Sequence, residues 1–563
     1  MKGADWTVRQ QFKFNAGAMQ AASTPELQFD FVIVGAGSAG CVLANRLSAD
    51  ASVRVALLEA GAADNSIWMR IPLGVGKLLG DERCMWQADT EPEAELHGNR
   101  LYWPSGKVLG GSSSVNGMLF VRGHPHRYDA WRDAGCPGWG YDDFLPYFRK
   151  LEDCGFGDPH ERGRGGPIAV TEVPGDPLTD GFVEACVQAG ARRAIDYNVG
   201  EPDGAAPLQL ATRDGVRCSA ATAYLKPARS RPNLTVISGA LATRILFEGT
   251  RARGVEFMSG DRTTTVRATR EVLMCAGAIR SPQLLELSGV GDATVLGELG
   301  IGVIAHLPGV GENLQDHLMP RIAFECNTHE TINDMLGSPW RMGKALARYA
   351  LSRKGLFATP SLTALAYMRS RPEAEHTDIR IQIGHVSSTS RFAVSRATGI
   401  DPHSGFHLGG YFIFPRSRGR LHVRSRNAAE PPRIEPRYLS HADDRDGIVR
   451  TLRILRRVSA QPALARFIVR EVRPGADVAS DDELLDYARS TGQTCWHPAG
   501  TCAMGVQPNS VVDPQLRVRG TAGLRVVDAS VMPLLVSSNT NVPTIAIAEK
   551  AADLILADVH GAP

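Results

Sequence analysis

The first clear pattern of hydrophobic and polar positions lies near the start of the chain. Residues 31–34 form a short apolar run, Phe-Val-Ile-Val, which is typical of a buried strand. A glycine-rich turn at 35–40 follows, and apolar side chains then recur at helical spacing over 41–47. A second apolar run, 53–58, ends in Glu59. Strand, glycine turn, helix, strand and acid in this order predict a dinucleotide-binding βαβ unit.

The glycines of this turn stand where the phosphates of a nucleotide need space. Gly35 permits the tight turn, Gly37 allows the backbone to approach a pyrophosphate, and Gly40 lets helix and strand pack closely. The helix N-terminus then faces the phosphates with unpaired N–H groups. Glu59 follows the turn by about 20 residues, the spacing of an acid that accepts a ribose hydroxyl, so it favours FAD or NAD over NADP. The alternative is an ordinary βαβ turn with a surface Glu.

Three later stretches also combine small residues with apolar runs. Residues 106–117 hold glycines and serines of little bulk, which suit a loop around a polar cofactor, while the apolar residues among them disfavour a flexible linker. Residues 272–275 indicate a strand, and Ser281 is the expected N-cap of the next helix. Residues 524–527 indicate a strand, and a helix is expected over about 544–555. Amide side chains just before that helix N-terminus would make a site for an anion or a polar ring.

The segments 150–235 and 321–480 carry weaker patterns. Alternating stretches at 410–414 and 420–424 suggest antiparallel strands. Five arginines fall between 416 and 426. For this basic run we favour a solvated turn between two strands over a site for an anionic lipid or a partner.

Composition excludes several classes of protein. Of the 563 residues, 43% are hydrophobic and 22% charged, which are globular values and exclude disorder for the bulk of the chain. Lys and Arg number 62 against 60 Asp and Glu, so the chain lacks the strong basic excess of a nucleic-acid binder. At roughly 100–200 residues per domain, two to four domains or one large enzyme fold are expected.

Cysteine usage and hydropathy bear on the location of the protein. None of the ten cysteines forms a CxxC pair and no zinc spacing is present, so we expect reduced, mostly buried thiols and a cytoplasmic protein. No apolar run of about 18 residues occurs, so no integral membrane segment is predicted. Residues 1–29 lack a continuous apolar stretch and are expected to form a tail rather than a secretory signal.

Five motifs, in order, resemble those of the glucose–methanol–choline (GMC) oxidoreductase family. They lie at 106–123, 277–291, 309–317 (Gly-Val-Gly-Glu-Asn-Leu-Gln-Asp-His), 497–502 (His-Pro-Ala-Gly-Thr-Cys) and 539–543. The resemblance spans nearly the whole chain and is strongest to the bacterial branch of choline dehydrogenases, alcohol dehydrogenases and furfuryl-alcohol-type oxidases. It implies an α/β fold, with a Rossmann-like FAD-binding domain built from discontinuous segments and an α+β substrate domain, an antiparallel sheet backed by helices.

The resemblance also implies a division of the chain and an activity. The expected segments are a tail at 1–29, FAD-binding parts at 30–150, 236–320 and 481–563, and substrate-domain parts at 151–235 and 321–480. The implied reaction is oxidation of a primary alcohol, aryl, furanic or aliphatic, to the aldehyde by hydride transfer to flavin N5. The reduced flavin would be reoxidised by O2 or a quinone, and a quinone would bring the protein to a membrane periphery. The oligomeric state is left open.

Carried over residue by residue, the resemblance implies a set of contacts to non-covalently bound FAD. The expected contact residues are Gly35, Gly37, Ser38, Ala39, Gly40, Glu59, Val108, Asn116, Gly117, Met118, Leu119, Ala242, Trp496, Asp528, Ala529 and Thr540. The glycine turn would hold the pyrophosphate, Glu59 the adenosine ribose, and Ala242 the adenine through its backbone. Val115 stands where some members attach FAD to a histidine, so covalent attachment is not expected there.

His497 matches the catalytic histidine of the family, and Asn539 matches its partner. Loss of hydride from a protonated alcohol would leave an expensive cation, so a base must take the O–H proton. Imidazole suits this task because its ordinary pKa of about 6.5 leaves it neutral near pH 7. Asn539 does not titrate, so one dominant ionisation is expected in the pH profile. Trp496 is expected to line the pocket beside the flavin, with a core tryptophan packed away from substrate as the alternative.

The remaining histidines and competing functions are weighed as follows. His317 is expected to be structural, and the pair His124 and His126 is expected to have no third ligand and no metal. A flavin-containing lyase on the same fold, of the hydroxynitrile lyase type, is the alternative function, and bleaching of the flavin by an alcohol would distinguish the two. A two-nucleotide NAD(P)H enzyme would need a second glycine motif, which the sequence lacks. The intact pair His497 and Asn539 disfavours a non-catalytic binding protein.

Overall fold

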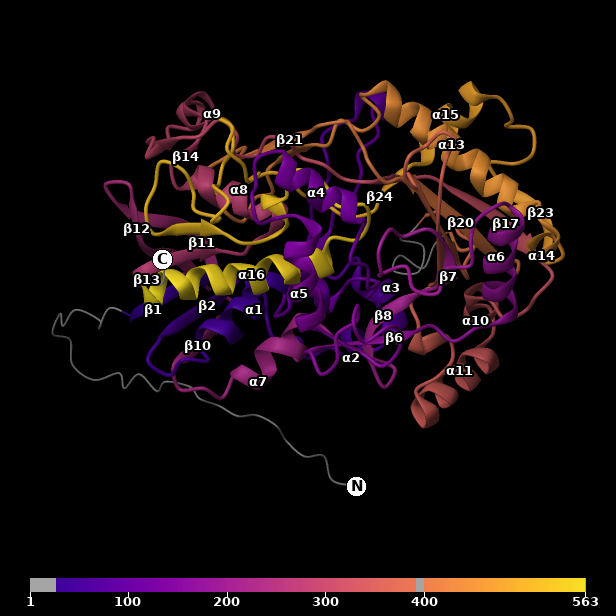
Figure 1. Cartoon of the computed structure of the whole chain (residues 1–563), viewed down its shortest axis with the longest axis horizontal. Helices are drawn as coiled ribbons and strands as arrows, with labels where there is room; N and C mark the ends of the chain where they lie inside the picture. The colour runs from indigo at the N-terminus through magenta and orange to yellow at the C-terminus, as the bar shows by residue number, and fades with distance from the viewer. Residues whose placement is uncertain (1–26, 391–398, 562–563) are drawn as a thin grey trace.

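A computed structural model describes residues 27–390 and 399–561 and contains two main sheets, each with helices packed on it (Figure 1). A seven-stranded sheet lies at the end of the molecule that carries the C-terminus, and a six-stranded sheet lies at the opposite end. Both sheets are assembled from segments that are far apart in the chain. The mixed α/β class expected from the sequence is confirmed.

The seven-stranded sheet has a parallel core extended by an antiparallel hairpin. Its strands in spatial order are β10 (Leu234–Ser238), β2 (Val55–Glu59), β1 (Leu27–Val34), β13 (Arg262–Met274), β12 (Arg251–Ser259) and β11 (Leu241–Glu248), with β25 (Leu524–Val526) also paired to β13. β1 pairs in parallel with both β2 and β13. It begins at Leu27 and buries Phe29, so the segment expected as a tail contributes its last three residues to the sheet. Polar Gln28 and Asp30 alternate with buried Phe29 and Phe31, a pattern too short to be conspicuous in the sequence.

Two helices carry the glycine turn and the C-terminal motif to the same place. α1 (Ser38–Leu47) buries the apolar positions expected of it and packs against α16 (Asn541–His560), which runs across the sheet in Figure 1. α16 begins at Asn541, earlier than expected, because Pro543 falls in its first turn, where a missing N–H has no intrahelical partner to lose.

The helix after β13 also begins earlier than expected. α8 spans Gly277–Leu287, so Ser281 and Pro282 lie inside it rather than at its start. The Ser281 hydroxyl donates to Asp528 Oδ2 at 2.6 Å instead of capping the helix. Tertiary contact with the C-terminal segment therefore overrides the local capping signal.

The six-stranded sheet is antiparallel throughout and is backed by helices, as the resemblance implies. Its strands in spatial order are β23 (Ile468–Arg473), β17 (Arg321–Cys326), β20 (Gly405–Phe412), β19 (Ile379–Gly384), β18 (Leu362–Met368) and β7 (Gly204–Pro207). α13 (Ala442–Ser459) packs on β20, and α6 (Pro177–Gln188) packs on β7 and β18. Of the alternating stretches in the sequence, one overlaps the end of β20 and the other contains β21 (Arg420–His422).

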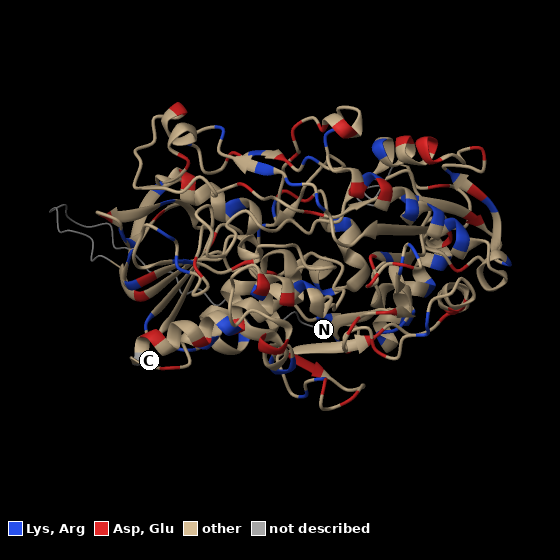
Figure 2. Ribbon diagram, turned by 45° about the horizontal axis from the view of Figure 1, so that its top comes forward, with Lys and Arg blue, Asp and Glu red and all other residues tan. Residues whose placement is uncertain are grey.

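Acidic and basic residues are interspersed along the elements of both sheets and their helices (Figure 2). All ten cysteines are buried and none forms a disulfide, as expected. Within the described residues, no helix has the length and hydrophobicity needed to span a bilayer.

Candidate active site

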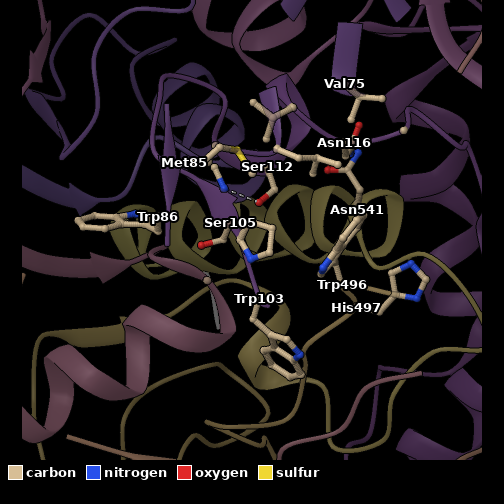
Figure 3. A pocket seen from close by; sticks show the side chains of 18 of the residues that line it. Val75, Met85, Trp86, Trp103, Ser105, Ser112, Asn116, Trp496, His497 and Asn541 are labelled. Atoms are coloured by element: carbon tan, nitrogen blue, oxygen red, sulfur yellow. Dashed lines mark hydrogen bonds between the residues drawn. The ribbon is translucent and has the colours of Figure 1, made fainter. Parts of the chain in front are cut away.

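A cavity of about 540 Å³ extends from the glycine turn after β1 to the six-stranded sheet. The expected cofactor residues line it, apart from Gly40 and Val108, and so do His497 and Asn539. Figure 3 shows Trp496, His497, Asn116 and Asn541 gathered around this cavity. Residues from both ends of the chain therefore meet at one site.

The glycine turn is shaped by steric contact on one side and open space on the other. A Cβ on Gly40 would lie 1.9 Å from the carbonyl oxygen of Gly35, and a Cβ on Gly35 would lie 2.5 Å from that of Cys275. Gly35 also has a φ of +97°, which L side chains rarely adopt. At Gly37 the nearest such atom is 3.8 Å away, so this residue leaves room for a ligand in the cavity. Gly40 packs α1 against the turn, which is why it does not line the cavity.

Glu59 lies at the end of β2 with its carboxylate buried beneath the glycine turn. Its two oxygens accept hydrogen bonds from the backbone N–H of Ala36 at 2.9 Å and of Gly61 at 2.8 Å. Burial raises the pKa of this carboxyl to about 7, although the two N–H donors oppose the shift. Each oxygen keeps a second lone pair, so the carboxylate can still accept a hydrogen bond from a hydroxyl group of a ligand.

The start of α16 and the residues before it form the far wall of the same cavity. Thr540 precedes the helix, and Asn541 accepts a hydrogen bond from Ser38 Oγ at 2.7 Å, which joins the N-termini of α1 and α16. Asp528 is buried and accepts from Gly277 N at 2.8 Å, so it holds the start of α8 as well as lining the cavity beside Ala529. Two helix N-termini thus present their positive ends to one space.

The glycine–serine stretch wraps another side of the cavity. Asn116 Oδ1 accepts from Met118 N and from the guanidinium of Arg217, each at 2.9 Å. This holds Met118 at a φ of +61°, which non-glycine residues rarely adopt. Val115, Gly117, Leu119 and, on β11, Ala242 complete this part of the lining. Val108 lies behind it, in a buried cluster with Met85.

His497 is held by hydrogen bonds on both ring nitrogens. Its Nδ1 lies 3.1 Å from Nδ1 of His317, and its Nε2 lies 2.8 Å from Nδ2 of Asn539. Nε2 of His317 lies 3.2 Å from the carbonyl oxygen of Ile413. Nη1 of Arg380 donates to Oδ1 of Asn539 at 2.9 Å. These contacts form one chain from Ile413 to Arg380.

The two ends of this chain decide where its protons lie. The carbonyl of Ile413 only accepts, so Nε2 of His317 carries the proton and its Nδ1 accepts from Nδ1–H of His497. Arg380 only donates, so Oδ1 of Asn539 faces it and Nδ2 faces His497. Both ends give the same result, in which Nε2 of His497 is unprotonated. Burial lowers the pKa of His317 to about 3, so this residue stays neutral.

The backbone around His497 is also fixed. Asp316 Oδ1 accepts from the His497 N–H at 2.7 Å, and burial raises the pKa of this aspartate to about 6. Trp496 has a φ of +60° and donates from Nε1 to the Tyr102 carbonyl at 3.3 Å, with its ring on the cavity wall. This turn orients the two neighbouring side chains of Trp496 and His497 differently (Figure 3).

The sequence analysis did not identify Arg380, and it did not predict that the ring of His317 contacts that of His497. Arg380 is 1% exposed, lines the cavity, and donates to Tyr411, Ser538 and Asn539. The local pattern gave no signal for it, because the alternation Ile-Arg-Ile-Gln-Ile of β19 predicts a polar face exposed to solvent, whereas both faces of this strand are buried. For His317, no sequence signal shows that its ring meets that of His497.

Among the described residues, the group of side chains that could share a metal ion contains His124 with Glu201 and His376, and not His126. Nε2 of His124 and Nδ1 of His376 each lie 3.3 Å from Glu201 Oε1, and the three atoms lie within 4.8 Å of one another. Nδ1 of His124 accepts from the His126 N–H at 3.2 Å, which puts the proton of the neutral ring on Nε2, facing Glu201. The geometry is that of an imidazole N–H facing a carboxylate, and a metal at Nε2 would have to displace that proton.

The cavity combines a glycine turn that suits a nucleotide with a histidine whose Nε2 is unprotonated. These features indicate a flavoprotein that oxidises alcohols, and comparison with known proteins agrees. The family model described as GMC oxidoreductase matches residues 29–319 with its N-terminal part and 415–548 with its C-terminal part. The chain belongs to the GMC oxidoreductase family, and it is an FAD-dependent enzyme acting on CH–OH groups.

Three relatives indicate the breadth of the family around this chain. The oxygen-dependent choline dehydrogenase of Vibrio vulnificus (strain YJ016) is 41% identical over 534 residues, covering 94% of each chain. The alcohol dehydrogenase (acceptor) of Pseudomonas putida is 40% identical, covering 94% of this chain and 96% of the relative. The crystal structure of pyridoxine 4-oxidase from Mesorbium loti is 34% identical with a TM-score of 0.84, covering 93% of this chain and 98% of that one.

Proposed function

We propose that this protein oxidises an uncharged primary alcohol to the aldehyde, with Nε2 of His497 as the proton acceptor. The observation that carries the proposal is the hydrogen-bond chain through His317, His497 and Asn539, because its two ends leave Nε2 unprotonated. A base is needed because hydride departs from a carbon whose oxygen still holds a proton. General-base catalysis of this kind is worth about 10²–10⁴ in rate.

The alcohol hydroxyl takes the place that the Asn539 amide holds at Nε2. Imidazole nitrogen has one lone pair there, so the substrate O–H and the amide N–H compete for it. Once displaced, the amide donates to the substrate oxygen. Arg380 adds a buried positive charge behind Asn539, which stabilises the negative charge that develops on that oxygen as the proton leaves.

The residues of the cradle fit FAD. Gly37 offers open space at a helix N-terminus, which suits a pyrophosphate, and Glu59 keeps lone pairs for a ribose hydroxyl. We assign the remaining contacts to the other expected residues that line the cavity. The chemistry that bound FAD supplies is acceptance of the hydride. Val115 lines the cavity and has no nucleophilic atom for a covalent bond.

The charges of the cavity favour a substrate without a cationic group. Within the described residues, the acids that line it are Glu59 and Asp528, both engaged with backbone N–H groups, and the sequence 391–398 contains neither Asp nor Glu. Arg380 has no carboxylate within ion-pair distance among the described residues, so its charge repels a quaternary ammonium near His497. Asp316 opposes this repulsion from behind His497, but it does not line the cavity. Two of the relatives reported above are named for choline and pyridoxine, and for this chain we favour a neutral aryl or aliphatic alcohol.

Apolar and aromatic side chains on the substrate side of the cavity support this choice. They include Leu73, Met335, Phe357, Leu362, Val386 and Trp496. Such a lining stabilises a hydrocarbon or aromatic body while the hydroxyl group meets His497. We propose O2 or a quinone as the final electron acceptor; a quinone would be met at the periphery of a membrane.

The test is an anaerobic absorbance experiment on the purified holoenzyme. Benzyl alcohol, furfuryl alcohol, a linear primary alcohol and choline are added one at a time, and the flavin band is followed. We expect one or more of the neutral alcohols to bleach it and choline to leave it oxidised; admitting air then separates oxidase from dehydrogenase. A flavin that no alcohol bleaches would contradict the proposal in favour of a lyase, and fast bleaching by choline alone would overturn the charge argument.

A further inference from the structure

A second pocket opens on the surface behind His317 and His497. It lies between α4 (Pro125–Asp133) and the segment that precedes β21, which are neighbours in Figure 1. Phe414 forms part of its wall and directly follows Ile413, the residue whose carbonyl accepts from His317. Arg127 on α4 donates from Nε to the Leu535 carbonyl at 2.8 Å, so the pocket is tied to the segment that leads to Asn539.

Cationic side chains dominate the lining of this pocket. Its polar members are His126, Arg127, Arg416, Arg418 and His441. The guanidinium of Arg127 lies over the ring of Phe414, 4.9 Å from its centroid, which fixes its orientation. The basic run recognised in the sequence is therefore not only a solvated turn, because two of its arginines converge with a third from α4.

Two of these arginines form no ion pair within the described residues. Among the described residues, neither Arg127 nor Arg418 has a carboxylate within ion-pair distance; Arg418 donates to the carbonyls of Pro415 at 2.9 Å and Ser417 at 3.0 Å. Arg416 is paired with Asp443 at 3.0 Å. Asp444, which attracts Arg418 from a greater distance, already accepts backbone N–H groups with both of its oxygens.

Without a bound ligand, the repulsion between these arginines destabilises the folded protein. Burial and, to a smaller extent, the neighbouring Arg418 and Arg416 together lower the pKa of Arg127 to about 9. Like charges held together at a partly buried site are stabilised when an anion binds between them. Guanidinium groups favour phosphate, because their planar N–H groups match two of its oxygens.

We propose that this pocket binds a phosphate dianion, free or as a phosphate monoester, between Arg127 and Arg418. A phosphate group carries about −1.5 to −2 charges at pH 7 and can offer a charged oxygen to each of the two arginines that form no ion pair, whereas a chloride or a single carboxylate carries one charge. Phe414 and Pro415 give the pocket an apolar part of its wall, which suits the organic part of a monoester. This site is separate from the alcohol site and does not depend on the reaction proposed above.

The test measures binding of inorganic phosphate to the holoenzyme by calorimetry and by thermal unfolding, at constant ionic strength against chloride. We expect saturable binding and a rise in the unfolding temperature, because a ligand that binds only the folded state stabilises it. The variants Arg127→Gln and Arg418→Gln should each weaken binding by about ten-fold or more, since a hydrogen bond to a charged group is worth about 1.5–3 kcal/mol. Arg457→Gln, at an exposed position on α13, is the matched control and should bind like the wild type.

Each result bears on the proposal. The proposal would be overturned if the wild type shows no saturable binding of phosphate. It would also be overturned if the Arg127→Gln and Arg418→Gln variants bind phosphate as tightly as the wild type does. The Gln variants remove mutual repulsion, so their unfolding temperature without phosphate should be no lower than that of the wild type. Their FAD content should be unchanged, so lost binding is not confused with misfolding. A parallel sedimentation with vesicles of phosphatidic acid separates the sources: competition by free phosphate indicates the same pocket, and vesicle binding that survives in both variants contradicts it.

Discussion

The alcohol cavity and the surface phosphate pocket both hold arginine without a carboxylate, yet they differ in how that charge is satisfied. Arg380 is buried and donates to the neutral oxygens of Tyr411, Ser538 and Asn539. Arg127 and Arg418 lie nearer the surface and bond only to backbone carbonyls in the described part of the chain. The first arginine is thus oriented by side-chain oxygens of the cavity, whereas the other two are held by the backbone.

This difference indicates whether the negative charge near each arginine forms during the reaction or is already present on the ligand when it binds. A neutral alcohol can enter the cavity without an ionic penalty, and Arg380 acts only as the hydroxyl loses its proton. The surface pocket instead favours a ligand that is already anionic in solution. The same side chain therefore serves catalysis in one region and recognition in the other.

The largest expected effect comes from removing the proton acceptor. His497→Gln keeps a polar group of similar size but no basic nitrogen, so anaerobic flavin reduction by a good alcohol substrate should slow by about 10²–10⁴-fold. FAD content should be unchanged, because the residues of the cradle are untouched. Stopped-flow absorbance measures the rate, and reduction at the wild-type rate would show that the base lies elsewhere.

Removal of the buried charge should have the next largest effect. Arg380→Gln keeps a donor to Asn539 but loses the positive charge, and we expect flavin reduction to fall by about 10²–10³-fold, as when a donor to a developing oxyanion is lost. The same variant should narrow the gap between neutral alcohols and choline. If the rate falls while choline remains excluded to the same degree, the charge argument for specificity fails.

Glu59→Ala should affect retention of the cofactor rather than its chemistry. It leaves the N–H groups of Ala36 and Gly61 without their buried acceptor and removes the site for a ribose hydroxyl. We expect the FAD dissociation constant to rise about 10–100-fold, with reduction of the loaded fraction within about two-fold of wild type. Fluorescence titration of the apoenzyme measures this, with exposed Glu82→Gln as control; equal FAD affinity would remove Glu59 from the site.

The smallest effect is expected at His317, which acts through His497. In His317→Phe the Nδ1–H of His497 loses its acceptor, the imidazolium form is less stable, and the pKa of the base falls. The pH midpoint of flavin reduction should therefore move down. His317→Gln restores an acceptor oxygen and should return the midpoint toward wild type, whereas a purely structural role would leave it in place in both variants.

The βαβ unit that contains the glycine turn could be predicted from sequence because the residues that define it lie close together in the chain. The turn from Gly35 to Gly40 and the acid Glu59 fall within one βαβ unit, whose spacing is set by strand and helix geometry. Helix starts were less predictable. Ser281 and Pro282 have the properties of a cap, but the contact with Asp528 places them inside α8.

The surroundings of His497 and of the surface pocket could not be predicted in the same way, because the residues in contact there are far apart in the chain. Arg380 meets Asn539 across 159 positions of the chain, and His317 meets His497 across 180. Arg127 and Arg418 likewise join only when α4 folds against the segment before β21. The resemblance to a family supplied His497 and Asn539, but only the packed structure brings the histidines and arginines around them together.

The most direct test of the central claim is the pH dependence of anaerobic flavin reduction in the wild-type enzyme with saturating benzyl alcohol, or the neutral alcohol that reduces it fastest. Protonation of Nε2 abolishes the base, so the rate constant should be low at acid pH and rise through one ionisation to a plateau. Asn539 does not titrate, and burial keeps the pKa of His317 near 3, so neither adds a second step. Asp316 contacts the backbone N–H of His497 rather than its ring, so its ionisation should change the rate less than that of His497. A rate independent of pH, or one that falls as pH rises, would contradict the assignment of His497 as the proton acceptor.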